Sequence, residues 1–318
     1  MTLTELRYAV ALAREKHFGR AAAACFVSQP TLSVAIRKLE SELGVTLFER
    51  SMQDVHVTPV GEQVVAQAQQ VLSQVSAIKE MVVQGRDPLN GPLHIGVIYS
   101  IAPYLLPNLM AYMFKTHPQM PLIVQEQYTH NLIEWVKQGK LDAAILALPF
   151  SDSGLAVEAL YDESFFVTLP QTHPLAKKTQ ITSHELRKES LLVLGAGHCF
   201  REHVLEATPD APLYKVEEDG LQRNFEGSSL ETLRYMAAAG IGITVLPALA
   251  VPKHVDEDHL AYVPLMHGKK SDAHVPHRRI VLIWRKNFSR EAACHALAQA
   301  VRESGLHGVQ LLSAPTAA

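Results

Sequence analysis

Cysteine is scarce in this chain. Only three occur among 318 residues, Cys25, Cys199 and Cys294, and they lie far apart in the sequence. The chain has 16 histidines, but no His-x-x-x-His or Cys-x-x-Cys pair provides the spacing of a metal site. We therefore predict free thiols in place of structural disulfides, no bound metal and no cofactor.

Long hydrophobic runs are also missing. No stretch approaches the roughly 18 apolar residues that a membrane-spanning helix needs. The N-terminal segment has no recognisable secretion signal, because charges at Arg7, Arg14, Glu15 and Lys16 interrupt it. We therefore expect a protein of the reducing cytoplasm with no membrane partner. The net charge is −3, so any nucleic-acid surface must be local.

Signatures of several enzyme classes are absent as well. The sequence contains no glycine-rich phosphate loop, no nucleophile elbow and no evident pair of catalytic carboxylates. We expect a protein that is not an enzyme. A solute-binding protein or a thiol peroxidase is the remoter alternative for the second half of the chain, and the missing export signal argues against the first of these.

The first 50 residues are locally basic, with seven Lys or Arg and five Glu. Their apolar spacing predicts three short helices, over residues 3–16, 18–26 and 27–44. Thr4 is a candidate N-cap of the first helix. Ser28 is a candidate N-cap of the third, and Gly44 is a natural stop. The predicted buried stripe of the third helix is Leu32, Ile36, Leu39 and Leu43. After this helix, apolar and polar residues alternate and turn residues occur, which predicts a small two-stranded wing.

Residues 58–85 form one long apolar repeat with a spacing of three and four residues. This spacing predicts an amphipathic helix. Its stripe consists of Val64, Ala68, Val71, Val75, Ile78 and Val82. Since few neighbouring segments of the chain are available to bury this stripe, we expect a second copy of the chain to cover it.

From Leu93 onward, predicted strands and helices alternate. Strands over 92–98, 120–127 and 141–148 are separated by two predicted helices, and further strands follow. This order predicts parallel strands joined by crossover helices. The fold class is therefore α/β with an N-terminal helical head. The last eight residues are expected to be frayed.

Residues 18–50 have the features of a helix-turn-helix. Gln29 can bond an adenine edge through two hydrogen bonds, while Arg37 and Lys38 suit guanine or phosphate. Hydroxyls near a helix N-terminus suit phosphate. The candidate DNA-binding residues are Ser28, Gln29, Pro30, Thr31, Ser33, Arg37, Lys38 and Arg50. From spacing alone, the same residues could be only the solvated face of a helix.

The stretch "FGRAAAACFVSQPTLSVAIRKLESELGVTLFER", followed by Thr58 and Gly61, resembles the winged helix-turn-helix of the LysR-type transcriptional regulators. The resemblance implies double-stranded promoter DNA as a partner, a homodimer through the long helix, a homotetramer, and contact with RNA polymerase. It also implies a two-lobed, periplasmic-binding-protein-like effector domain. The expected boundaries are 1–58 for the head, 59–87 for the linker helix, 88–305 for the effector domain and 306–318 for a tail. Within the effector domain, the first lobe would hold about 88–161 and 268–305, and the second lobe about 162–267.

The effector half resembles the OxyR-like, peroxide-sensing branch of this family. The matching stretches are "GHCFRE", "EGSSLETLRYMAAAGIGITVLPALAVP", "YLLP" and "KLDAAILALP". The resemblance implies that Cys199 is the thiol that peroxide oxidises and that Ser100 and Thr129 lie at its pocket, with His130 next to it. The alternative is that Cys199 is a small buried apolar residue.

The chemistry of such a site is compatible with the residues around Cys199. Only a thiolate attacks peroxide efficiently, and positive charge favours the thiolate. A helix that begins near Cys199 would place the thiol at its positive end. Arg201 adds charge, as does His198 if it is protonated.

The family's second cysteine is missing. It normally lies nine positions after the first, where this chain has Thr208, and threonine cannot form a disulfide. A sulfenic acid on Cys199 would need Cys294, Cys25, a second subunit or a small thiol as its partner. The chain could be a one-cysteine peroxide sensor, a regulator that responds to another small effector, or a form locked in the reduced state.

Overall fold

The computed structural model describes residues 1–50, 55–83, 87–150, 154–211, 226–227, 229–253, 259–266 and 275–313. The chain divides into two compact units, one built on its first 86 residues and one on the remainder. Parts of the predicted linker and tail, at 84–86 and 314–318, lie outside the described residues. None of the described helices is long and apolar enough to cross a membrane.

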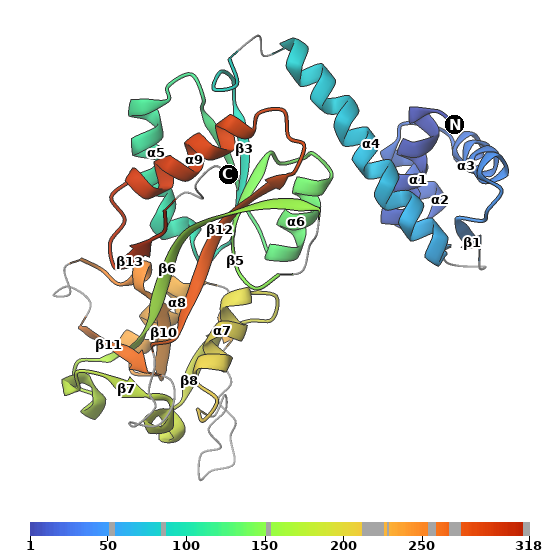
Figure 1. Cartoon of the computed structure of the whole chain (residues 1–318). Coiled ribbons are helices and arrows are strands. Elements are labelled where there is room, and N and C mark those ends of the chain that lie inside the picture. Colours follow the sequence, from blue (N-terminus) through green and yellow to red (C-terminus); the bar gives the residue numbers. More distant parts are fainter. Residues whose placement is uncertain are drawn as a thin grey trace. The chain divides into compact units, whose positions relative to one another are not determined.

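The first unit has the order of elements that the sequence predicted (Figure 1). Its elements are α1 (Leu3–Glu15), α2 (Phe18–Ala24), α3 (Gln29–Leu43), β1 (Phe48–Arg50), β2 (Val55–Val57) and α4 (Pro59–Val83). Strands β1 and β2 pair in antiparallel register as the predicted wing. Apolar side chains from the helices and the wing form one core.

The predicted caps of α3 are confirmed. Ser28 is the N-cap and its hydroxyl accepts a hydrogen bond from the Thr31 amide, while Gly44 ends the helix in the left-handed region. The predicted cap of α1 is wrong, because Thr2 fills that role. Its side chain and that of Glu5 exchange hydrogen bonds with each other's backbone amides, and this capping box starts the helix two residues earlier.

The Thr-x-x-Gly pair of the resemblance has a local physical reason. The Thr58 hydroxyl donates to the Thr46 carbonyl at 2.8 Å and accepts from the Gly61 amide at 2.9 Å, which fixes the start of α4. A Cβ atom on Gly61 would lie 2.3 Å from the Leu47 carbonyl oxygen, so only glycine fits there. The wing and α4 are thereby held close together.

The predicted stripe of α4 is only partly covered. Ala68 is buried in the core of the first unit, and Val64 packs against that core. Beyond them, Val71 is 36% exposed and Ile78 is 61% exposed. The C-terminal half of the stripe therefore presents apolar surface within this single chain.

The second unit begins with the predicted alternation: β3 (Leu93–Val97), α5 (Ala102–Thr116), β4 (Leu122–Glu126), α6 (Thr129–Lys137) and β5 (Ala143–Ala147). Strand β3 pairs in parallel with both β4 and β5, as predicted. The carboxyl ends of β3 and β4 therefore meet at one edge of the sheet.

The next strand is the long β6 (Leu155–Pro170). It pairs in antiparallel register with β12 (His277–Arg285) and with β10 (Ile243–Pro247). The prediction that parallel strands continue is therefore wrong for β6 and β12. Strand β12 comes from much later in the chain and lies between β5 and β6, antiparallel to both, a placement that the local strand and helix spacing does not encode.

The other elements complete two lobes, one around the first half of β6 and one around its second half. They are η1 (Pro174–Lys177), β7 (Ile181–Thr182), η2 (Ser183–Lys188), β8 (Leu191–Leu194), α7 (Cys199–Ala207), β9 (Glu226–Gly227), α8 (Leu230–Ala238), η3 (Ala248–Ala250), β11 (Leu260–Met266), α9 (Glu291–Glu303) and β13 (Val309–Leu311). One apolar cluster lies around β3, β5 and β12, and a second lies around β8, β10 and α8.

The C-terminal segment differs from the sequence expectation. Residues 306–318 were predicted to be a tail with frayed ends, but Val309–Leu311 form β13 and pair with β6 in antiparallel register. The short apolar run Val309–Leu312 supplies this strand, and the Leu312 amide continues the pairing by donating to the Leu160 carbonyl.

Candidate functional site

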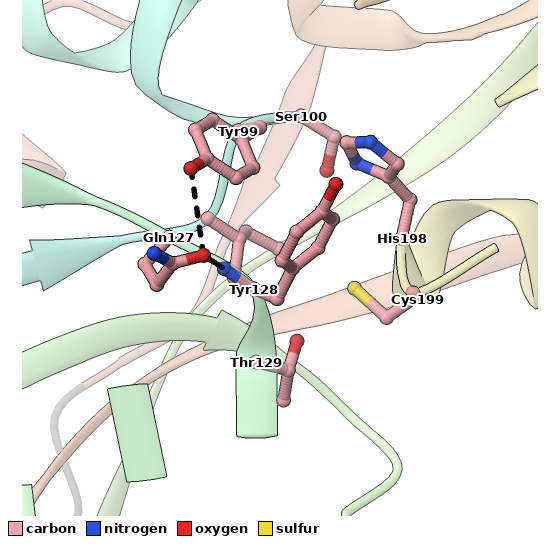
Figure 2. Close-up of a pocket in the computed structure, with 9 residues that line it drawn as sticks. Tyr99, Ser100, Gln127, Tyr128, Thr129, His198 and Cys199 are labelled. Atoms are coloured by element: carbon pink, nitrogen blue, oxygen red, sulfur yellow. Dashed lines mark hydrogen bonds between the residues drawn. The ribbon is translucent and has the colours of Figure 1, made fainter. Parts of the chain in front are cut away.

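A small pocket lies where four predicted residues, Ser100, Thr129, His198 and Cys199, come together (Figure 2). Ser100 follows β3, Thr129 begins α6 just after β4, and Cys199 begins α7. The cavity measures about 10 Å³, which is close to the space that one enclosed water molecule occupies. Its lining consists of Ile98, Tyr99, Ser100, Gln127, Tyr128, Thr129, Gly197, His198 and Cys199.

Cys199 is the first residue of α7, as the sequence predicted, and its side chain is partly buried. The positive end of the helix therefore lies at the thiol. Gly197 enters the turn with a φ of +95°, and a Cβ atom there would come within 3.4 Å of the Tyr128 ring. The glycine before Cys199 thus serves both the turn and the close packing of the pocket wall.

His198 packs between two aromatic rings. Its ring centroid lies 4.9 Å from that of Tyr128 and 5.8 Å from that of Tyr99. Burial lowers the pKa of His198 below its ordinary value, because desolvation disfavours the imidazolium. This lowered pKa works against the positive charge that His198 would add only if it were protonated.

Arg201 makes its hydrogen bond outside the pocket. Its guanidinium donates to the backbone carbonyl of Leu194 at 2.7 Å, and Arg201 is not among the residues that line the pocket. This contact joins α7 to the end of β8. Arg201 thus helps to place α7, and its contribution of positive charge to the thiol stays a prediction.

Thr129 and Ser100 both line the pocket, but their hydroxyls differ. The Thr129 oxygen is buried and has no hydrogen-bond partner among the described residues. The Ser100 oxygen accepts a hydrogen bond from Arg278 at 2.7 Å. An unpartnered buried hydroxyl is costly, so Thr129 is the group best able to bind a small polar molecule beside the thiol.

His130 lies outside the cavity. It is exposed, and its ring stacks on that of Tyr128 with an angle of 7° between the planes. The expectation that it lies next to the pocket holds, but it is separated from the cavity by the tyrosine.

The sequence reasoning missed a buried ion pair behind the pocket. The Arg278 guanidinium contacts the Glu163 carboxylate at 2.7 Å, and both side chains are almost fully buried. The same guanidinium also lies 4.5 Å from the centre of the Phe200 ring. Arg278 therefore joins the residue after Cys199 to Ser100 and β6. Its sequence neighbours give no signal for this, since only the antiparallel pairing of β12 with β6 brings it there.

Three further lining residues were also missed. The Tyr99 hydroxyl donates to the Gln127 side-chain oxygen at 3.4 Å, and that oxygen accepts from the Tyr128 amide at 2.9 Å (Figure 2). A signal existed for these, because Tyr99 lies between β3 and Ser100, and Gln127 and Tyr128 lie between β4 and Thr129. Polar residues at such strand ends gather at one edge.

Thr208 lies at the opposite end of α7 from Cys199. It is the C-cap residue, it is buried, and its hydroxyl donates to the Val204 carbonyl. A helical rise of 1.5 Å per residue places the two positions about 13 Å apart along the axis. A side-chain bridge between them would require α7 to unwind.

The other two cysteines are poor reaction partners in this fold. Cys294 is completely buried in the core of the first lobe, and burial raises the pKa of its thiol. Cys25 ends α2 and packs against the core of the first unit, and burial raises the pKa of this thiol too. The described residues contain no cluster of three groups able to hold a metal ion.

The predicted DNA-binding residues are placed mainly as expected. Gln29, Pro30 and Thr31 occupy the exposed first turn of α3, Ser28 caps it, and Arg37 is exposed further along. Ser33 is half-buried. Lys38 differs, because its ammonium forms an ion pair with Glu5 of α1 at 3.0 Å. Arg50 lies in β1, and its side chain is outside the described part.

Comparisons with known proteins agree with this architecture. Residues 3–62 match the family described as "Bacterial regulatory helix-turn-helix protein, lysR family", and residues 86–305 match "LysR substrate binding domain". Together these define a LysR-type regulator, with the α/β fold class and the winged helix-turn-helix that the sequence predicted.

Individual relatives narrow the family. The chain is 40% identical to the "Hydrogen peroxide-inducible genes activator" of Pectobacterium carotovorum over 95% of this chain and 96% of the relative. It is 40% identical to the "DNA-binding transcriptional dual regulator OxyR" of Escherichia coli K12, with 95% of each chain covered. A full-length OxyR variant structure from Pseudomonas aeruginosa is 45% identical, covers 98% of both chains and has a TM-score of 0.72. The chain therefore belongs to the LysR family of transcriptional regulators, and within it to the OxyR regulators.

Proposed function

We propose that this regulator senses hydrogen peroxide through Cys199. The observation that carries the proposal is the pocket itself: a cavity of about 10 Å³ that holds the thiol and the unpartnered Thr129 hydroxyl. A cavity of this size admits only very small molecules. It therefore favours peroxide over a larger non-redox effector, which is the second candidate that Thr208 keeps open.

In the proposed reaction, the Cys199 thiolate attacks one peroxide oxygen. A sulfur–oxygen bond forms as the oxygen–oxygen bond breaks, and the hydroxide that leaves takes up the proton lost by the thiol on ionisation, giving water. Sulfur is oxidised to sulfenic acid and peroxide is reduced. Thr129 is placed to donate a hydrogen bond to the departing oxygen, and the N-terminus of α7 stabilises the thiolate.

With threonine at position 208, the sulfenic acid persists or passes to an external thiol. The oxidised side chain is larger and more polar than the thiol. Because the cavity has so little spare room, Tyr128 and the start of α7 would have to shift. This shift would be the signal carried to DNA.

The remaining parts of the proposed function concern partners and organisation. Double-stranded promoter DNA would bind along α3, and a homodimer would form through the uncovered stripe of α4. A homotetramer, contact with RNA polymerase and a cytoplasmic location complete the proposal. The domain boundaries at 58, 87 and 305 belong to it as well, with β13 joined to the effector domain.

The test combines mass spectrometry of all three cysteines with footprinting across a peroxide titration. Sulfenic acid should form first on Cys199, and Cys294 serves as an internal control because it is fully buried. Cys199→Ser should abolish the peroxide response and leave basal DNA binding intact. If Cys199 reacts no faster than free cysteine, the sensor proposal fails and the non-redox effector becomes the better account.

A further inference from the structure

Phe26, in the turn between α2 and α3, combines two unusual properties. Its side chain is 96% exposed, although phenylalanine is normally buried. Its backbone has a φ of +57°, in the left-handed region. For a bulky residue that conformation is an outlier, so both the side chain and the backbone of Phe26 are unfavourable within this chain.

The turn itself requires the left-handed conformation. The Phe26 amide donates to the Ala23 carbonyl at 3.1 Å, and the Val27 amide donates to the Ala22 carbonyl at 3.0 Å. This pair of bonds is a Schellman motif, in which the residue after the C-cap is left-handed and is usually glycine. Glycine would serve the fold better, so the exposed ring at position 26 points to a contact outside the chain.

A second exposed apolar residue lies on α3. Val34 is 64% exposed. It shares one helix face with Pro30 and Arg37, because these positions are spaced by four and three residues. The opposite face carries the fully buried stripe of Leu32, Ile36 and Leu39. Val34 therefore lies at the centre of the face that α3 turns away from its own core.

We propose that Phe26 and Val34 make apolar contacts with the C5-methyl groups of thymines in the major groove of the target DNA. The proposal rests on DNA binding through α3. The thymine methyl is the apolar group on the base edges of that groove, and phenylalanine is a suitable partner for it. Val34 shares its α3 face with Arg37, and Phe26 lies three residues before Gln29 in the turn that leads into α3. This continuity favours DNA over a second protein as the occupant.

The experiment uses the full-length protein and a duplex that the wild type selects from a random-sequence pool. Each thymine is replaced in turn by deoxyuridine, which lacks only the methyl group. At one or more positions, we expect wild-type binding to weaken about fourfold, the factor for losing one buried methyl-sized group. The Phe26→Ala or Val34→Ala variant should bind more weakly than the wild type. At the thymine that the missing side chain contacts, deoxyuridine should then cause no further loss of affinity.

A stability measurement separates the ring from the backbone. Phe26→Gly should raise Tm because glycine fits the left-handed turn, whereas Phe26→Ala keeps the strain and should not raise it. In both variants, the difference in affinity between the thymine and deoxyuridine duplexes should disappear to the same extent. Binding to a non-selected duplex should remain unchanged in each, since phosphate contacts dominate there.

Three outcomes would overturn the proposal. If deoxyuridine has no effect at any position in the wild type, no methyl group is read. If Phe26→Ala and Val34→Ala bind the selected duplex as tightly as the wild type but lose transcription with RNA polymerase, the contact is with protein. If the wild type selects no sequence from the pool, base reading through α3 fails as a whole, which differs from the loss of the methyl contact alone.

Discussion

The Thr129 hydroxyl and the Cys199 thiol face the same small cavity, although one begins α6 and the other begins α7 (Figure 2). Thr129 Oγ1 has no hydrogen-bond partner among the described residues. A buried hydroxyl in that state costs about 1–3 kcal/mol, so the pair is better suited to binding a small polar molecule than to stabilising the fold.

Thr129→Val should slow the oxidation of Cys199 by about 100-fold, the effect of removing one hydrogen-bond donor from a developing oxyanion. Valine keeps the shape and removes the hydroxyl, so the free energy of unfolding should stay equal or rise. Stopped-flow kinetics with peroxide and urea unfolding measure the two effects. Thr129→Ser is the matched control and should react like the wild type; equal rates for Val and Ser would refute the role of the hydroxyl.

Two neighbouring residues of β6 should differ strongly in their effect on stability. Glu163→Ala leaves the buried Arg278 without its carboxylate, which should cost about 3–5 kcal/mol. Asp162→Ala removes the partner of Arg279, whose side chain is 46% exposed, and should cost at most about 1 kcal/mol. Urea unfolding of the two variants compares them directly. Equal losses would show that burial of the Arg278 pair is not decisive.

Thr208→Cys should allow a disulfide with Cys199, but only after peroxide has oxidised Cys199. The two positions lie at opposite ends of α7, and a disulfide needs Cα atoms within about 7 Å. Far-UV circular dichroism should therefore show loss of helix together with the new bond, and peptide mass spectrometry should identify it. A disulfide that forms with no loss of helix would contradict the placement of α7.

The effector unit should lose stability in mild acid. Burial lowers the pKa of His203; its Nε2 contacts the Leu148 carbonyl at 2.7 Å, and its buried Nδ1 has no partner among the described residues. The unfolded state takes up a proton near pH 6.5 while the folded state does not. The free energy of unfolding therefore falls as pH drops below 6.5 toward the lower folded-state value.

His203→Gln can keep the hydrogen bond to Leu148 but cannot titrate. The decrease in unfolding free energy between pH 7 and pH 5.5 should be smaller in this variant than in the wild type, as measured by urea titration at each pH. An identical pH dependence would exclude His203 as a source.

Val71→Glu should convert dimers to monomers, because it places a charge in the uncovered stripe of α4. Glutamate is a good helix former, so α4 itself should persist. Gln70→Glu adds the same charge at an exposed neighbour and is the matched control. Sedimentation velocity measures the mass; an unchanged mass for Val71→Glu would show that the dimer does not use this stripe.

Local signals in the sequence were enough to predict the N-terminal helical head and the order of its helices and strands. Ser28, Gly44 and the buried Leu32, Ile36 and Leu39 act within a few residues of one another, so spacing and capping predict them. The prediction was wrong for Leu43, which lies in the last turn of α3 and is 37% exposed. Cys199 at the start of α7 was predictable for the same reason. Thr4 failed as the cap of α1 because Thr2 and Glu5 form a two-residue motif, and nearby hydroxyls compete for one role.

Only the tertiary structure decided what surrounds the thiol. Arg278 reaches Ser100 and Glu163 because β12 pairs in antiparallel register with β6, a long-range register that local spacing does not encode. Burial, which lowers the pKa of His198, likewise depends on rings from other segments. The sequence alone determined that a thiol would stand at a helix start; the packing of distant strands determined the size of its cavity and the unpartnered hydroxyl of Thr129 beside it.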